Sequence, residues 1–209
     1  MSGIIAQNVG RHTGLIKAAE GGGGAWNVIQ SITASGDASV SFTSGIDSTY
    51  KQYYIAWNNV NTVTGGESDA GVVQINFSID SGSNYNVSKT SSYYAAYHKE
   101  DDNEAYAAYS TYWDGTKTTA QTVMNSMGAA ADECGAGYIY LFNPSDTTFI
   151  KHFFGTHSVY HQDDFSQNGY FAGYANTTSA IDAVQFTALG ASYSGSDNFD
   201  GVFTLYGIT

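Results

Sequence analysis

Histidine and aspartate side chains gather in one stretch of the sequence, which contains His152, His157, His161, Asp163 and Asp164. Zinc takes its ligands from such residues, and an i, i+4 pair reaches one metal ion when the segment is helical. The surrounding residues 149–160 are aromatic and strand-like. On a strand, His157 and His161 stand about 13 Å apart at roughly 3.3 Å per residue. We therefore predict ordinary core or surface histidines, and we assign neither a metal nor a cofactor.

An acidic run, Glu100, Asp101, Asp102 and Glu104, follows directly after His98. A calcium site needs several oxygens that converge from a fixed loop. The run lacks the alternating Asp and Asn residues with a central glycine that build such a loop in EF-hands. A solvated acidic loop is the prediction, and a weak calcium site is the alternative.

The sequence contains no Gly-x-Ser-x-Gly, His-Glu-x-x-His or phosphate-loop motif. Glycoside hydrolysis needs one protonated and one ionised carboxyl group, which can come from distant positions. Many of the acidic residues here lie in turns, such as Asp37, Asp80, Asp146 and Asp197, where solvation and ordinary acidity are expected. We therefore predict no enzymatic activity, with a polysaccharide depolymerase as the least favoured reading.

Tyrosine and tryptophan are concentrated in residues 93–113. These side chains combine a rigid contact area with a polar edge, as in antibody paratopes. We single out Tyr94, Tyr97 and Trp113 as candidates for surface recognition. The alternative is that the aromatic side chains pack the interior of the domain and its contacts with other subunits.

The charge balance excludes several classes of partner. Seven Lys and Arg stand against nineteen Asp and Glu, which gives a net charge of −12. Binding to a nucleic-acid backbone or to anionic lipid needs clustered basic residues, so we predict no nucleic-acid partner. No apolar run is long enough for membrane insertion or for a secretion signal. The single cysteine, Cys134, excludes an intrachain disulfide.

Short strand-like segments, separated by turns rich in Gly, Asn, Asp and Ser, dominate the chain after residue 25. They are Trp26–Thr33, Ser39–Thr43, Tyr50–Asn58, Gly71–Ile79, Ser91–His98, Tyr138–Phe142, Thr147–Phe154, Gly169–Ala175, Ala180–Thr187 and Gly201–Tyr206. In Gly71–Ile79, the apolar Val73, Ile75, Phe77 and Ile79 share one face. The pattern predicts a mainly β fold, an antiparallel β-sandwich of jelly-roll type. The only helix predicted is Thr119–Met127, from the spacing of Val123, Met124 and Met127.

Residues 1–25 differ from the rest of the chain. Two apolar pairs, Ile4-Ile5 and Leu15-Ile16, precede the run Gly21–Gly24. Four glycines favour a hinge. We therefore divide the chain into an extended docking arm, residues 1–25, and a β-sandwich domain, residues 26–209. The arm is the predicted anchor on another protein, and a frayed terminus is the alternative.

Several segments together resemble a family of small virion proteins of marine tailed bacteriophages, including those that infect cyanobacteria. They are Met1–Asn8, Gly14–Lys17, the glycine run with Ala25-Trp26, Phe42–Lys51, Asp80–Asn86, Leu141–Ser145, Phe149–Phe153, Gly173–Ala180 and Leu205–Ile208. The opening octapeptide and the final Leu-Tyr-Gly-Ile are the most specific parts of the resemblance. The stretch Tyr93–Trp113 fits the family pattern least clearly.

The resemblance implies a structural protein on the exterior of the particle, made in the host cytoplasm, with other tail, vertex or capsid proteins as partners. It implies a homotrimer, because such accessories commonly sit on threefold axes, and it supplies no catalytic residues. A tail-fibre or tip module that adheres to a host-surface glycan or protein is the first expectation. A capsid decoration protein that clamps the shell is the alternative.

Overall fold

The computed structural model describes residues 25–63, 71–130, 132–190, 193 and 195–209. The predicted arm residues Ile4, Ile5, Leu15 and Ile16 lie outside the described residues, so the docking arm stays a prediction. The described part of the chain forms antiparallel strands, and it includes no helix that could cross a membrane.

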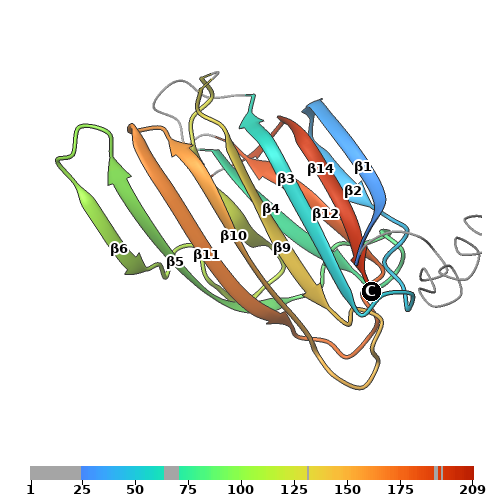
Figure 1. Cartoon of the computed structure of the whole chain (residues 1–209). Helices are drawn as coiled ribbons and strands as arrows, with labels where there is room; N and C mark the ends of the chain where they lie inside the picture. The colour runs from blue at the N-terminus through green and yellow to red at the C-terminus, as the bar shows by residue number, and fades with distance from the viewer. Residues whose placement is uncertain (1–24, 64–70, 131, 191–192, 194) are drawn as a thin grey trace, which may run out of the picture.

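A large antiparallel sheet forms one layer of the molecule (Figure 1). Its strands lie in the order β1 (Trp26–Asp37), β14 (Phe199–Ile208), β3 (Gln52–Thr62), β9 (Gly135–Phe142), β10 (Lys151–His161), β11 (Phe165–Ala175), β5 (Lys89–Lys99) and β6 (Ala105–Tyr109). The short β7 (Gly115–Thr118) pairs with the first residues of β5, and β6 pairs with later ones. The chain therefore folds back twice onto the free edge of β5.

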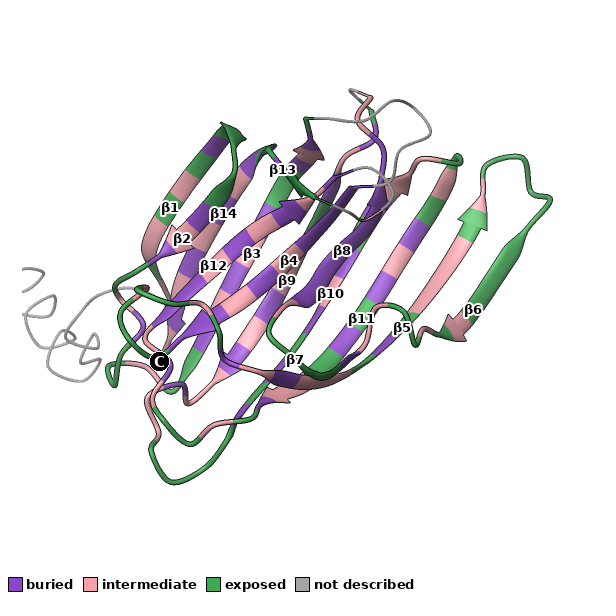
Figure 2. Ribbon diagram, turned by 180° about the vertical axis from the view of Figure 1, so that it is seen from behind, coloured by how far each residue is buried: buried purple, intermediate pink, exposed green. Residues whose placement is uncertain are grey.

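A smaller sheet covers the other face of the large one, behind it in Figure 1 and in front of it in Figure 2. It contains β2 (Ser39–Phe42), β12 (Ala183–Leu189), β4 (Gly71–Ser78) and β8 (Gln121–Met127), with β13 (Ser196–Asp197) beside the end of β12. The two layers join at one corner, where Met127 of β8 pairs with His161 of β10. Every strand pair is antiparallel, so the predicted mainly β, antiparallel sandwich is confirmed.

Aromatic side chains from both sheets interlock in the core. Phe77 of β4 meets Phe153 of β10 with ring centroids 5.7 Å apart, and Phe186 of β12 lies between Trp57 and Phe203 of the large sheet. All five are buried, and burying one such ring stabilises the fold by about 1.5–3 kcal/mol. The core therefore holds the two layers in a fixed relation.

The alternation predicted for Gly71–Ile79 is present along β4. Val73, Ile75 and Phe77 are buried, whereas Ile79 follows the end of the strand and is exposed. Residues on one side of a pleated strand repeat every second position, so a single buried face accounts for the three core residues.

The predicted helix at Thr119–Met127 is wrong, because Gln121–Met127 forms strand β8. All seven residues of this strand are buried, so the sequence has no solvent face to give an alternating pattern. The pairing of β8 with β4 is also irregular, and Ser126 has a positive φ of 61°. Such a bulge shifts the register, which lets Met124 and Met127 both reach the core.

The small sheet does not extend as far as the large one. β8 is its last strand, and the inner faces of β5 and β6 project beyond it (Figure 2). This overhang leaves part of the inner face of the large sheet without a facing strand, and the candidate site lies there.

Candidate functional site

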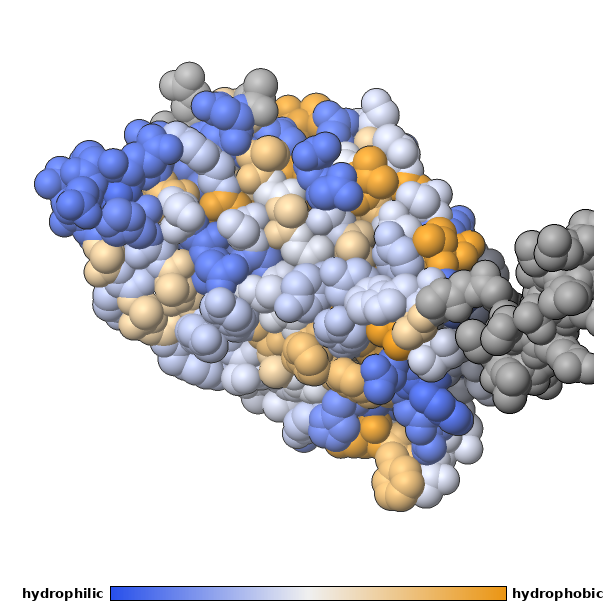
Figure 3. All heavy atoms as spheres, in the orientation of Figure 1, coloured by the Kyte–Doolittle hydropathy of each residue, from blue (hydrophilic) through white to orange (hydrophobic). Residues whose placement is uncertain are grey.

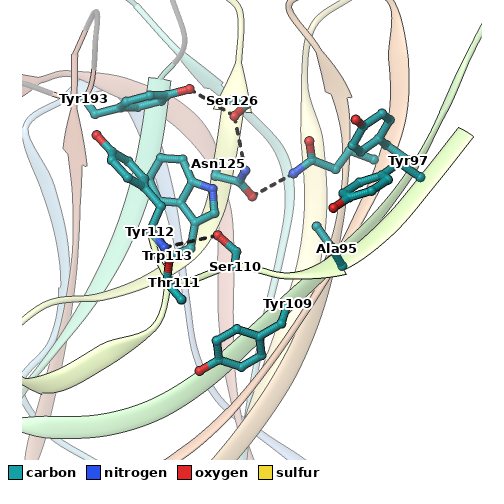
Figure 4. A pocket seen from close by; sticks show the side chains of 13 residues that line it. Ala95, Tyr97, Tyr109, Ser110, Thr111, Tyr112, Trp113, Asn125, Ser126 and Tyr193 are labelled. Atoms are coloured by element: carbon teal, nitrogen blue, oxygen red, sulfur yellow. Dashed lines mark hydrogen bonds between the residues drawn. The ribbon is translucent and has the colours of Figure 1, made fainter. Parts of the chain in front are cut away.

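An open cleft of ≈ 510 Å³ lies between the inner face of the β5–β6 hairpin and the edge of β8. Residues from four separate regions of the chain line it: Ala95, Tyr97, Tyr106, Ala108, Tyr109, Ser110, Thr111, Tyr112, Trp113, Asn125, Ser126, Gln167 and Tyr193. Figure 4 shows aromatic rings at both sides of the opening and amide groups between them. Clefts of this size, with apolar walls and a few polar groups, are typical of small-molecule sites.

One wall of the cleft consists of three aromatic rings. Trp113 lies between Tyr112 and Tyr193, with centroid separations of 4.6 and 4.7 Å and nearly perpendicular ring planes. The loop that carries Tyr112 is held by the backbone bond from Ser110 N to the carbonyl oxygen of Tyr93, at 2.9 Å. Edge-to-face aromatic pairs contribute about 0.5–1.5 kcal/mol beyond their buried area. The three rings of this wall therefore support one another.

The opposite wall comes from the β5–β6 hairpin. Tyr97 and Tyr106 are directly paired across the two strands, with ring centroids 5.6 Å apart. Phe165 of β11 supports the Tyr97 ring at 4.9 Å. Cross-strand neighbours point to the same side of a sheet, so both tyrosines face the cleft.

A buried hydrogen-bond chain supports the polar floor. The Tyr93 hydroxyl donates to Asn125 Oδ1 at 2.5 Å, and Gln167 Nε2 donates to the same oxygen at 3.0 Å. His157 Nε2 lies 2.6 Å from the Tyr93 hydroxyl oxygen. Because a phenol has one hydrogen, already directed at Asn125, His157 Nε2 must carry a proton and donate it. These hydrogen bonds therefore fix the orientation of the Asn125 and Gln167 side chains at the cleft.

The floor continues toward the aromatic wall. Asn125 Nδ2 donates to Ser126 Oγ at 3.2 Å, and Ser126 Oγ lies 3.3 Å from the Tyr193 hydroxyl (Figure 4). A row of amide and hydroxyl groups thus connects the buried histidine with the ring at the cleft opening. Such groups can both donate and accept hydrogen bonds.

The walls carry no formal charge, but carboxylates lie at the rim. None of the described residues that line the cleft is acidic or basic. Tyr97 donates to Glu104 at 3.1 Å and Tyr109 donates to Asp114 at 2.6 Å. Burial and the bond to Glu104 raise the pKa of Tyr97, and the bond to Asp114 raises that of Tyr109. Both phenols therefore stay neutral near pH 7, beside a negatively charged rim.

The structure brings together two of the three residues singled out for recognition. Tyr97 and Trp113 line the cleft. Tyr94 belongs to the same strand as Tyr97 but lies three positions earlier, which places it on the opposite face of the sheet. There it stacks on Tyr170 with ring centroids 4.8 Å apart. Tyr94 is therefore not part of the cleft.

Sequence reasoning missed the cleft residues that come from distant strands. Asn125 belongs to β8, Gln167 to β11, and Tyr193 to a connection after β12. Only the topology brings them together, so no local pattern could have marked them.

The histidine-rich segment is a strand, as predicted. His157 is buried inside β10, whereas His152 is exposed on the other face of that strand. His161 lies at the end of β10, with its Nδ1 3.6 Å from Asp163 Oδ2. In the part of the chain that the structure describes, no group of three or more His, Cys, Asp or Glu side chains is placed to hold a metal ion.

The acidic run 100–104 forms the connection between β5 and β6. Its side chains bond locally, as in the 2.9 Å contact between His98 and Asp102, both of which are exposed.

Two of the turn aspartates, Asp80 and Asp146, depart from the expected ordinary acidity. Asp146 accepts bonds from the backbone N–H groups of Thr148 and Phe149, and these bonds lower its pKa. The pKa of Asp80 is lowered in the same way, first by Asn84. Asp197 was expected to be solvated but is buried. Turn N–H groups stabilise the ionised carboxylate, which is a structural role.

No protein-family model matches the chain, and no curated protein matches it in sequence. Among solved structures, the CBM2 module of the evolved Dit of Lactobacillus casei BL23 phage J-1 is similar at 15% identity and TM-score 0.33, covering 81% of this chain and 68% of that one. The marine PL-14 alginate lyase from Aplysia kurodai gives 13% identity and TM-score 0.31, with 78% and 71% covered. Scytalido-glutamic peptidase gives 15% identity and TM-score 0.25, with 76% and 66% covered.

Proposed function

We propose that this chain is a non-enzymatic recognition module that binds an uncharged carbohydrate in the cleft between β5–β6 and β8. The observation that carries the proposal is the composition of the cleft. Aromatic rings form two opposing walls, and amide and hydroxyl groups form the floor between them. A sugar offers apolar C–H faces to rings and hydroxyls to amides, so both kinds of surface have a partner.

The charges around the cleft favour a neutral ligand. Glu104 and Asp114 lie at the rim, bonded to Tyr97 and Tyr109, and no cation lies among the described lining residues. The chain as a whole carries a net charge of −12. A uronate or sialylated glycan would meet like charge at the rim of the cleft, and like charges disfavour association.

The same composition argues against turnover. General acid–base catalysis needs a group whose pKa lies near the working pH. The ionisable side chains that line the cleft are tyrosines; burial and the bond to Glu104 raise the pKa of Tyr97, and the bond to Asp114 raises that of Tyr109. Burial lowers the pKa of His157 to about 3, and this residue lies behind Tyr93, away from the cleft surface. The proposed module therefore binds its ligand without cleaving it.

The proposed location is the exterior of a tailed-phage particle, where the module adheres to host-surface glycan. This part rests on the sequence resemblance and on the predicted anchoring arm. Several identical modules on one particle would compensate for a shallow, weak site by multivalent attachment. Measuring the copy number per particle distinguishes a fibre or tip, present in tens or fewer, from a shell decoration, present in hundreds.

Glycan-array screening followed by titration calorimetry tests the proposal. We expect binding to neutral oligosaccharides of the host surface. Tyr97→Ala should weaken that binding by about three- to tenfold, since an aromatic contact contributes about 0.5–1.5 kcal/mol. Tyr94→Ala is the matched control, because it removes a ring from the other face of the same strand. The absence of any glycan ligand, or release of reducing ends from host polysaccharide, would contradict the proposal.

A further inference from the structure

A second aromatic surface covers the outer face of the large sheet, opposite the core. One row crosses four strands in register, from Tyr206 of β14 through Tyr54 and Tyr140 to Phe154 of β10. Val28 of β1 continues this row as the partner of Tyr206. We call this surface the outer aromatic face. Figure 3 shows pale and orange residues across the middle of this side of the molecule, with deep blue residues at the β5–β6 end and at other places along the margin.

The rings of the outer aromatic face pack against each other. Tyr54 contacts Tyr140 at 4.9 Å and Trp26 at 4.7 Å, and Tyr140 contacts Phe154 at 5.3 Å, all with tilted or perpendicular planes. Stacking on a sugar needs a free, flat ring face. Here most neighbouring rings are tilted or perpendicular to each other, so they do not form one flat platform. A surface of tilted rings fits the side chains of a protein better than it fits the flat face of a sugar.

The outer aromatic face is almost free of charge in a strongly acidic protein. Strands β3, β9, β10 and β11 contain no Asp, Glu or Arg, and their one lysine, Lys151, is buried. Exposed positions of these strands are filled by aromatic, hydroxyl and small side chains instead. Two molecules of this chain, each with a net charge of −12, repel each other. They can approach most closely where each one lacks acidic groups.

The size and relief of the face also fit a protein partner. Six strands, β1, β14, β3, β9, β10 and β11, lie about 4.8 Å apart and are roughly 30 Å long, which gives a face of about 850 Å², and a stable interface buries about 800 Å² per partner. Large rings occupy the β14–β3–β9 part. Small residues at the other end, Ser92, Gly155 and Ala172, form the floor of a hollow of ≈ 230 Å³ beside Phe154. The large rings at one end of the face can therefore fit into the hollow at the other end of a second copy.

We propose that the outer aromatic face is where copies of this chain associate with one another. Val28 and Phe154 are 64% and 45% exposed, and association would cover these apolar groups. Interfaces are enriched in Tyr, Trp and Phe and depleted in charge at their centre, as this face is. In the threefold assembly expected from the resemblance, each copy would contact the next head to tail. The large rings on β14, β3 and β9 of one copy would fill the hollow beside Phe154 of the next copy.

Sedimentation velocity and multi-angle light scattering on the full chain test this proposal. We expect an oligomer at micromolar concentration. The variant Val28→Asp with Phe154→Asp should convert it to a monomer, because it places like charges in the interface. Both positions are exposed, so the fold should be retained, which circular dichroism and the melting temperature will check. Phe149→Asp is the control, since Phe149 is 70% exposed but precedes β10 in a loop, and this variant should remain an oligomer.

Two results would overturn the proposal. One is a monomeric wild-type chain, and the other is a folded double variant that keeps the oligomeric state of the wild type. If the wild type is monomeric and the folded double variant loses neutral-glycan binding, the face would be assigned to carbohydrate instead. The cleft is tested independently, because Tyr97→Ala leaves the outer aromatic face unchanged.

Discussion

His157 Nε2 lies 2.6 Å from the hydroxyl oxygen of Tyr93, and both residues are buried beneath the cleft. The hydroxyl also donates to Asn125 Oδ1, so one phenol connects a core histidine with a residue of the cleft floor. Burial keeps this histidine neutral by lowering its pKa to about 3. The pair therefore acts as a fixed support for the site across the physiological pH range.

Tyr93→Phe should destabilise the protein by about 1–3 kcal/mol, the cost of leaving buried polar groups without a partner. The change leaves the ring in place but removes the bonds to Asn125 and His157. Urea unfolding will measure the effect. Tyr94→Phe serves as the control, because Tyr94 is exposed on the other face, and its effect should stay within about 0.5 kcal/mol. Equal effects of the two substitutions would show that the buried hydrogen-bond chain adds little stability.

Gly169→Ala should also destabilise the protein, by about 1–3 kcal/mol, the usual cost of overpacking a core. Gly169 pairs with His157 across β10 and β11, and a Cβ atom there would overlap both His157 Nε2 and the Tyr93 hydroxyl. A double-mutant cycle with Tyr93→Phe provides the test. Part of the cost should disappear in that background, because the hydroxyl is gone. If Gly169→Ala costs the same stability in the wild-type and Tyr93→Phe backgrounds, the added Cβ atom overlaps only the imidazole of His157.

The sequence predicted those parts of the fold in which one face of a strand is buried and the other is solvated. The middle of strand β4 shows this alternation, with Val73, Ile75 and Phe77 buried and Gln74 and Asn76 partly exposed. The prediction failed at β8, where both faces are buried. It also missed β6 and β7, two short strands with mostly exposed side chains. Neither a fully buried nor a largely exposed strand shows apolar alternation, so these three segments gave no strand signal.

The candidate site was predictable only where aromatic residues are dense along the chain. That density pointed to Tyr97 and Trp113, which line the cleft. It also pointed to Tyr94, because local density does not reveal that positions 94 and 97 face opposite sides of a strand. Asn125 and Gln167 come from strands far apart in the sequence and meet only through the topology.

Lys89 should make stability rise with pH between about 7 and 10. Its ammonium group is buried over the Phe77 ring, with the Val87 and Thr119 carbonyl oxygens as acceptors, and burial lowers its pKa to about 7. The unfolded chain keeps the ordinary pKa of 10.5 and so binds more protons in this window. Stability therefore increases with pH there, by at most about 1.4 kcal/mol per unit.

Lys89→Met should remove this part of the pH dependence. The measurement is the free energy of unfolding at several pH values from 7 to 9, where tyrosines with the ordinary pKa of about 10 remain largely protonated. Lys51→Met changes an exposed lysine and should leave the slope of the wild type intact. Parallel curves for the wild type and Lys89→Met would mean that Lys89 keeps its ordinary pKa in the folded protein.

The rim carboxylates should determine which glycans enter the cleft. Asp114 accepts the Tyr109 hydroxyl at 2.6 Å and Glu104 accepts that of Tyr97 at 3.1 Å, so both charges are held beside the aromatic walls. Asp114→Asn with Glu104→Gln keeps the shape and the hydrogen-bonding capacity but removes both charges. Binding of uronate-containing oligosaccharides should then improve, by several-fold at low salt and less at high salt because the charges are screened. Binding of neutral oligosaccharides should change little.

Titration calorimetry with both ligand classes at two salt concentrations measures these changes in affinity. A double variant that still prefers neutral sugars to the same degree would show that the shape of the cleft, and not its charge, selects the ligand.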